Sequence, residues 1–100
     1  MTEEDVIMNA GKTVEWESSG KVKRGTLHEI VYPDEKADLV MRRCERTCDM
    51  SETRTTEISN LTEKSCILRA LVLVKRGGKS ILSDWYAPNI KWLRTVEGGQ

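Results

Sequence analysis

Phenylalanine is absent from this sequence of 100 residues, and histidine occurs once. Without Phe, a hydrophobic core must be filled by aliphatic side chains and by the few Trp and Tyr residues. The single histidine, His28, has Thr26 and Ile30 as neighbours on the strand predicted there, and no acid or nucleophile stands at a motif spacing from it. We therefore expect no catalytic site and interpret His28 as a structural or surface residue.

The chain also lacks a net charge, because 16 Lys and Arg residues balance 16 Asp and Glu residues. This balance provides no general attraction to nucleic acids or to acidic membranes. The longest apolar run, Ala70 to Val74, is far too short to cross a bilayer. The acidic start, Thr2 to Asp5, is unlike a signal peptide, which needs positive charge. We therefore expect a cytoplasmic protein that does not act at a membrane.

The chain contains only three cysteines, which are Cys44, Cys48 and Cys66. An odd number leaves a disulfide scaffold unbalanced, so reduced thiols are expected. Cys44 and Cys48 lie four residues apart, which is not a Cys-x-x-Cys spacing, and a structural zinc site needs four ligands. The sequence therefore predicts no metal and no cofactor.

The strongest patterns in the chain are those of β-strands. Residues 12–17 alternate between apolar and polar side chains, and residues 21–32 continue this pattern after a Ser-Ser-Gly turn. Gly25 stands where the apolar face of the second segment changes, which predicts a β-bulge or a sharp coil. Residues 66–75 are apolar on both faces, which is typical of a central strand, and a turn with two glycines follows at 76–79.

The densest segment is 79–94, which holds two of the three Trp residues and one of the two Pro residues. Its first half alternates like a strand, and Pro88-Asn89 interrupts the ladder. A short apolar strand through Trp92 and Leu93 is expected after this turn. We expect Trp16 and one of the two C-terminal Trp residues to lie in the core.

A helix is predicted at 35–47, because Asp34 is a suitable N-cap and apolar residues recur at steps of three and four. Acidic residues precede basic ones here, which suits the helix dipole. The competing interpretation is a strand at 38–42. Residues 49–64 are predicted to form a long loop with a short strand at Thr55 to Ile58.

These segments divide the chain into a flexible leader at 1–10, one domain at 11–95 with an insertion at 33–64, and a tail at 96–100. The segments Gly11–Trp16, Gly25–Val31, Leu71–Val74 and Trp85–Pro88, followed by Trp92-Leu93, resemble small SH3-like or Tudor/KOW-type barrels of bacterial and phage proteins. The resemblance implies a mainly β fold, an SH3-like small barrel of about five strands with one inserted helix or long loop. The alternative is an α+β fold in which the helix packs on a four-stranded antiparallel sheet.

Such barrels bind protein or nucleic acid without catalysis, so the resemblance implies a non-catalytic interaction module. We expect its partner to be another protein or a second copy of the chain, and we expect no small-molecule substrate. Aromatic side chains gathered at one open end form a contact surface for a peptide. The candidate residues for this surface are Tyr32, Trp85, Tyr86 and Trp92.

The alternative function is a nucleic-acid-binding regulator that uses basic hairpin tips as a rim against phosphates. A run of like charges is more often a solvated face, and the zero net charge disfavours strong non-specific binding. The candidate residues for this basic rim are Lys21, Lys23, Arg24, Lys75, Arg76 and Lys79.

Overall fold

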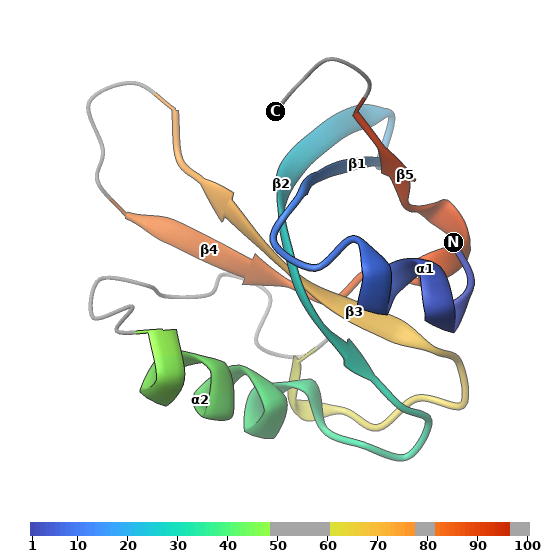
Figure 1. Cartoon of the computed structure of the whole chain (residues 1–100), viewed down its shortest axis with the longest axis vertical. Helices are drawn as coiled ribbons and strands as arrows, with labels where there is room; N and C mark the ends of the chain where they lie inside the picture. The colour runs from blue at the N-terminus through green and yellow to red at the C-terminus, as the bar shows by residue number, and fades with distance from the viewer. Residues whose placement is uncertain (49–60, 78–81, 97–100) are drawn as a thin grey trace.

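Five antiparallel strands form one open sheet in the computed structural model, which describes residues 1–48, 61–77 and 82–96 (Figure 1). The order across the sheet is β4-β3-β2-β1-β5. The predicted mainly β fold with an antiparallel sheet is confirmed. The predicted strand at Thr55 to Ile58 lies outside the described residues. The strand bounds are β1 Thr13–Ser18, β2 Lys21–Val31, β3 Arg69–Lys75, β4 Ser83–Tyr86 and β5 Arg94–Thr95.

The first two strands form a hairpin closed by Ser19 and Gly20. Both residues have positive φ, 52° and 77° respectively, and Ser18 pairs directly with Lys21. A two-residue turn with both φ angles positive has the twist that a hairpin needs. Glycine takes this conformation at no steric cost, which is why a Ser-Ser-Gly segment between two strand patterns predicts a turn.

The irregularity in β2 lies further along the strand than the sequence predicted. Leu27 pairs with Val72 and Ile30 pairs with Ala70, so β2 holds one extra residue between these pairs. The bulge therefore falls at His28 and Glu29 rather than at Gly25. An extra residue shifts the alternation of faces, so Leu27 and Val31, which a strict period of two puts on one face, are buried on opposite faces of the sheet.

Gly25 is instead required by close packing of the backbones of β2 and β3. A Cβ atom at this position would collide with the carbonyl oxygen of Leu73. It would also lie 2.9 Å from a methyl carbon of Val72 and 2.9 Å from one of Val74. A glycine inside a strand commonly marks such an approach.

Two hydrophobic clusters cover the two faces of the sheet, and α1 (Glu3–Met8) and α2 (Ala37–Cys48) lie on opposite sides (Figure 1). Both β2 and β3 contribute to both clusters, so the middle of the sheet is buried on both faces. The α1 side contains Val6, Val14, Trp16, Leu27, Ala70, Val72, Ile90 and Leu93, and the α2 side contains Val31, Ala37, Val40, Cys44, Leu61, Leu71 and Trp85.

Within the described residues, no helix has the length and apolarity that a membrane span requires.

Within the segment predicted as a flexible leader, residues 3–8 form the helix α1. Thr2 and Asp5 cap its first turn reciprocally, and Val6 is buried against the sheet. The backbone N–H of Thr2 donates to the Asp5 carboxylate, which lowers the pKa of Asp5. A helix of six residues is too short for an apolar period, but the capping box was a readable signal.

The helix predicted at 35–47 is confirmed as α2, and the competing strand is excluded. Glu29, on the bulge of β2, accepts hydrogen bonds from Arg43 Nη2 at 3.0 Å and from Cys44 Sγ at 3.7 Å. The bulge thus directs a polar side chain toward α2. The strand predicted through Trp92 is wrong, because Ile90–Trp92 form a 3₁₀ turn, η1, and β5 begins after Leu93.

Candidate binding groove

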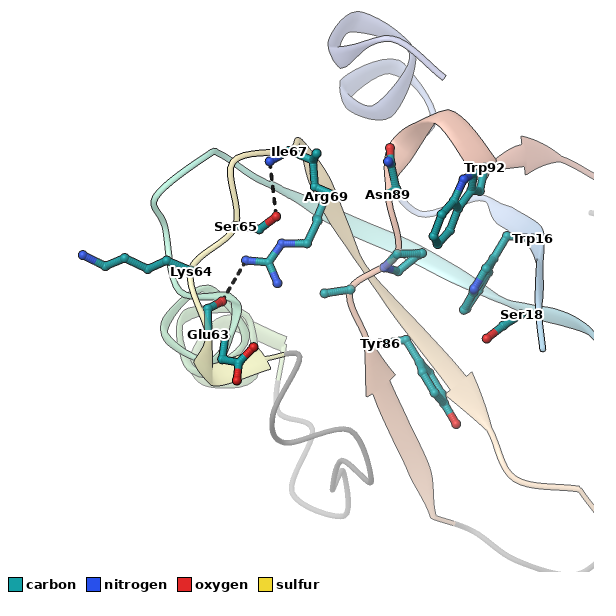
Figure 2. Close-up of a pocket in the computed structure, with 12 residues that line it drawn as sticks. Trp16, Ser18, Glu63, Lys64, Ser65, Ile67, Arg69, Tyr86, Asn89 and Trp92 are labelled. Carbon is teal, nitrogen blue, oxygen red and sulfur yellow. Dashed lines mark hydrogen bonds between the residues drawn. The ribbon is translucent and has the colours of Figure 1, made fainter.

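A groove of about 330 Å³ lies between the ends of three segments that are distant in sequence (Figure 2). One wall comes from β1, the end of β4 and η1, and the other comes from the segment that leads into β3. The first wall contains Trp16, Ser18, Tyr86, Ala87, Pro88, Asn89 and Trp92. The second contains Glu63, Lys64, Ser65, Ile67 and Arg69.

Aromatic rings dominate the first wall (Figure 2). Trp16 is 3% exposed and belongs to the core, so it is the most deeply buried aromatic side chain of this wall. Its ring meets Tyr86 edge to face, with centroids 5.9 Å apart and an interplanar angle of 63°. Trp92 is 58% exposed, which is unusual for so large an apolar side chain. The aromatic side chains of this wall therefore range from the buried Trp16 to the exposed Trp92.

Local backbone contacts hold Trp92 in its place. Asn89 caps η1, because its Oδ1 accepts from the N–H of Lys91 at 2.9 Å. The N–H of Trp92 donates to the carbonyl of Asn89 at 3.0 Å, and the carbonyl of Pro88 accepts from Ala70 at 3.1 Å. These bonds tie the turn to β3. The exposed indole is therefore carried by an ordered backbone.

The second wall contains a buried arginine that the sequence prediction did not single out. Arg69 is 6% exposed, and its Nη2 donates to the carbonyls of Glu35 at 3.1 Å and Glu63 at 3.3 Å. Burial disfavours its charged form and lowers the pKa of Arg69. Arg69 begins β3, a position that apolar periodicity cannot mark as a site.

The structure brings together only part of the predicted aromatic surface. Tyr86 and Trp92 line the groove. Trp85 is 0% exposed and belongs to the cluster under α2, so its assignment to an exposed surface is wrong. Tyr32 lies away from the groove, where its hydroxyl donates to Glu3 of α1 at 2.8 Å. That hydrogen bond raises the pKa of Tyr32.

The arginines of the predicted basic rim are paired within the molecule. Arg24 Nη2 contacts Glu15 at 2.9 Å, and Arg94 contacts the other oxygen of the same carboxylate at 2.9 Å. These two hydrogen bonds, from Arg94 first and then Arg24, lower the pKa of Glu15. Arg24 on β2 and Arg94 on β5 therefore share a single carboxylate on β1.

Arg76 is paired more closely still. Its Nε and Nη2 each donate to one oxygen of the Asp84 carboxylate at 2.9 Å, and Asp84 is buried. This bidentate contact raises the pKa of Arg76. The ammonium of Lys23 lies 4.1 Å from the centroid of the Tyr86 ring. Lys21 and Lys75 are exposed, and Lys79 lies outside the described residues.

His28 lies under α2 rather than in the groove. Its ring meets Trp85 edge to face with centroids 4.9 Å apart. Its Nε2 is buried and has no hydrogen-bond partner among the residues that the structure describes. Burial lowers the pKa of His28 below its ordinary 6.5, and the nearby charge of Glu29 opposes this shift only in part. The neutral imidazole is therefore the form that the fold favours.

This environment predicts a loss of stability in mild acid. The unfolded chain takes up a proton at His28 near pH 6.5, whereas the folded chain resists it to lower pH. The free energy of unfolding should therefore keep its full value above that pH, and it should fall as the pH drops toward the pKa of His28 in the folded chain. Urea unfolding between about pH 5.5 and about pH 7.5 measures this dependence. A His28→Phe variant, which keeps a ring but cannot titrate, should show a flat profile over the same range, and an unchanged slope would contradict the assignment.

The described residues contain no cluster of three or more His, Cys, Asp or Glu side chains that is suited to hold a metal ion. Cys44 is a buried free thiol and Cys66 is an exposed one. The groove itself is lined by aromatic, proline and arginine side chains among others. No protein-family model, no curated protein and no solved structure matches this chain.

Proposed function

We propose that the chain is a non-catalytic interaction module that binds an extended segment of a protein partner in the groove. The observation that carries this proposal is Trp92, an indole that is 58% exposed on a capped turn beside Tyr86 and Pro88. Trp and Tyr side chains are those that most often anchor protein interfaces, because they bury large areas at a small entropic cost. The groove volume of about 330 Å³ suits a few side chains of a peptide.

The fold that goes with this function is an SH3-like small barrel. Support comes from the return of β5 to β1, where Val14 pairs with Thr95 and Glu15 pairs with Arg94. This pairing places β5, and with it the end of η1, beside β1. The aromatic wall of the groove depends on this approach. The module is proposed to act in the cytoplasm, which agrees with the free thiols of Cys44 and Cys66.

A selection from a random-peptide phage library tests the proposed function. Wild-type protein is the target, and parallel selections use Trp92→Ala and Leu39→Ala. Leu39 is also exposed, at 56%, but it lies on α2 and does not line the groove. Peptides selected on the wild type should bind Leu39→Ala equally well and should bind Trp92→Ala about thirtyfold more weakly, as expected for an interface anchor.

A second measurement, an NMR titration of labelled wild-type protein, tests the nucleic-acid alternative. A mixed-sequence DNA duplex is titrated into labelled protein at low and at moderate salt, and amide shifts are followed by NMR. Shifts at Lys21, Lys23 and Lys75 that reverse with salt, together with no Trp92-dependent peptide, would overturn the proposal in favour of nucleic acid. The internal pairs of Arg24 and Arg76 argue for an unperturbed spectrum.

A further inference from the structure

We infer that the second half of β2 binds an extended segment of a protein partner as an added strand, and that this segment carries a basic residue next to an aliphatic one. The site is separate from the groove and goes beyond the proposed function. It lies at Ile30, where β2 continues past the start of β1 (Figure 1). An open strand edge is a template for pairing with another chain.

The strand pairing leaves the main chain of Ile30 open on this edge. Successive residues of an antiparallel strand direct their N–H and carbonyl groups to opposite edges. The N–H of Ala70 donates to Pro88, away from β2, so Ala70 and Ile30 face each other without hydrogen bonds. The N–H and the carbonyl of Ile30 therefore point to the outer edge, and they have no partner in the part of the chain that the structure describes.

The open edge is short, because hydrogen bonds close both of its ends. Leu27, before the bulge, bonds to the segment that leads into β1. Tyr32, two residues beyond Ile30, accepts the N–H of Glu35 at 3.0 Å and donates its own N–H to the Glu35 carboxylate at 3.0 Å. One residue of an antiparallel segment can satisfy both main-chain groups of Ile30. The edge thus suits a short contact with a single central residue.

A pocket of about 350 Å³ lies along this edge, and its α1 side is apolar. Val6 and Ile7 of α1 line it, and the Ile7 side chain is exposed. Ile30 itself packs against the cluster on the α1 side. Residues that face each other in an antiparallel pair have their side chains on the same face of the sheet. The central residue of the segment should therefore be aliphatic, because its side chain lies beside Ile30 and Ile7.

The charged residues that line the pocket carry more negative than positive charge. Glu29 and Arg43 form an ion pair at 3.0 Å, and Glu35 adds a second carboxylate. Glu35 accepts from the neutral N–H of Tyr32, which leaves its charge in place. The hydrogen bond and the charge of Glu29 raise the pKa of Arg43, and the charge of Glu35 raises it further. Side chains alternate between faces, so the neighbours of the central residue point to this α2 side, where Lys or Arg is favoured.

The probe for this site is the peptide Ser-Arg-Val-Arg-Ser with both ends blocked, titrated into labelled protein and followed by NMR. Amide shifts should concentrate at residues 28–32, with a dissociation constant of about 0.1 to 1 mM for so few contacts. N-methylation of the central valine removes the donor to the Ile30 carbonyl and should weaken binding about tenfold. N-methylation of the arginine that follows is the matched control, because its N–H points away from β2, and it should change the affinity less than about twofold.

Two variants of the protein test the preference for a basic segment. Glu35→Gln keeps an oxygen that accepts from Tyr32 but removes the charge, so the peptide should bind about threefold more weakly. Glu17→Gln removes the same charge from an exposed position on β1 that does not line the pocket, and it should leave the affinity unchanged. Trp92→Ala should also bind the peptide as the wild type does, since Trp92 lines only the groove.

Four results would overturn the inference. Equal binding of the two N-methylated peptides, or no shift at Ile30 with about 5 mM peptide, would exclude the added strand. Equal effects of Glu35→Gln and Glu17→Gln would exclude the basic specificity. Binding lost in Trp92→Ala would place the peptide in the groove, which leaves the proposed function intact. Shifts at residues 28–32 that follow protein concentration without peptide would assign the edge to a second copy of the chain.

Discussion

Replacing Trp85 by alanine is expected to lower the free energy of unfolding by about 4 kcal/mol, as for other fully buried aromatic side chains. Trp85 is 0% exposed and packs in the cluster under α2, where its ring also meets His28. Truncation leaves a cavity that the surrounding β3 and α2 side chains cannot fill by small shifts. A domain of this size is stable by about 5 to 15 kcal/mol, so the variant should be close to unfolding. Urea unfolding followed by circular dichroism measures the difference.

Trp92→Ala is the control for this prediction, because it removes the same side chain from an exposed position. Its free energy of unfolding should stay within about 0.5 kcal/mol of the wild type. If Trp92→Ala lowered the free energy of unfolding strongly and Trp85→Ala left it unchanged, the burial of Trp85 in the core and the exposure of Trp92 in the groove would both be contradicted. The same comparison establishes that loss of peptide binding by Trp92→Ala is not a consequence of unfolding.

Replacing Gly25 by alanine is expected to lower the free energy of unfolding by about 2 to 3 kcal/mol, the upper part of the range for overpacked interiors. The new methyl group would collide with the carbonyl oxygen of Leu73 and press on methyl groups of Val72 and Val74. A backbone oxygen in a strand cannot move without loosening the pairing of β2 with β3. Thermal unfolding by calorimetry should show a clearly lower midpoint.

Gly77→Ala provides the comparison for this substitution. Among the residues that the structure describes, no atom beyond Gly77 and its chain neighbours lies within 4 Å of a Cβ atom built at Gly77, so the effect on the free energy of unfolding should stay within about 0.5 kcal/mol. Equal effects of the two substitutions would show that lost chain flexibility, rather than the contact with β3, governs the response. Gly11 and Gly20 are unsuitable as controls, because their φ angles of 89° and 77° strain any alanine.

Sequence patterns predicted the strands well where burial alternates regularly. Val14 and Trp16 share a buried face, and Trp85 and Tyr86 point to opposite faces, as period two requires. That alternation also placed one of the two C-terminal Trp residues in the core. It could not decide between Trp85 and Trp92, because the exposure of Trp92 follows from the 3₁₀ turn after Pro88. Turn geometry of this kind depends on side-chain capping rather than on periodicity.

Two of the missed features share a physical cause, since each depends on contacts between distant segments. The bulge at His28 and Glu29 depends on where β3 pairs, and β3 lies some forty residues further along the chain. The burial of Arg69 depends on carbonyl groups from Glu35 and Glu63. The internal pairs of Arg24 and Arg76 join neighbouring strands of the two hairpins, so they were identified only once the strands were placed side by side. They weaken the basic rim that was predicted from the clustered Lys and Arg residues.

No single segment of the chain forms the groove, because its walls come from residues 16–18, 63–69 and 86–92. These segments meet only when β1 has paired with β5 and β3 lies between β2 and β4. A partly folded chain therefore has no binding site, and any peptide that occupies the groove selects the fully assembled sheet. Occupancy and folding are thermodynamically linked, so a bound peptide raises the melting temperature in proportion to the logarithm of its free concentration once it is in excess. Partners can thus be recognised by the stabilisation they confer, before anything is known of their sequence.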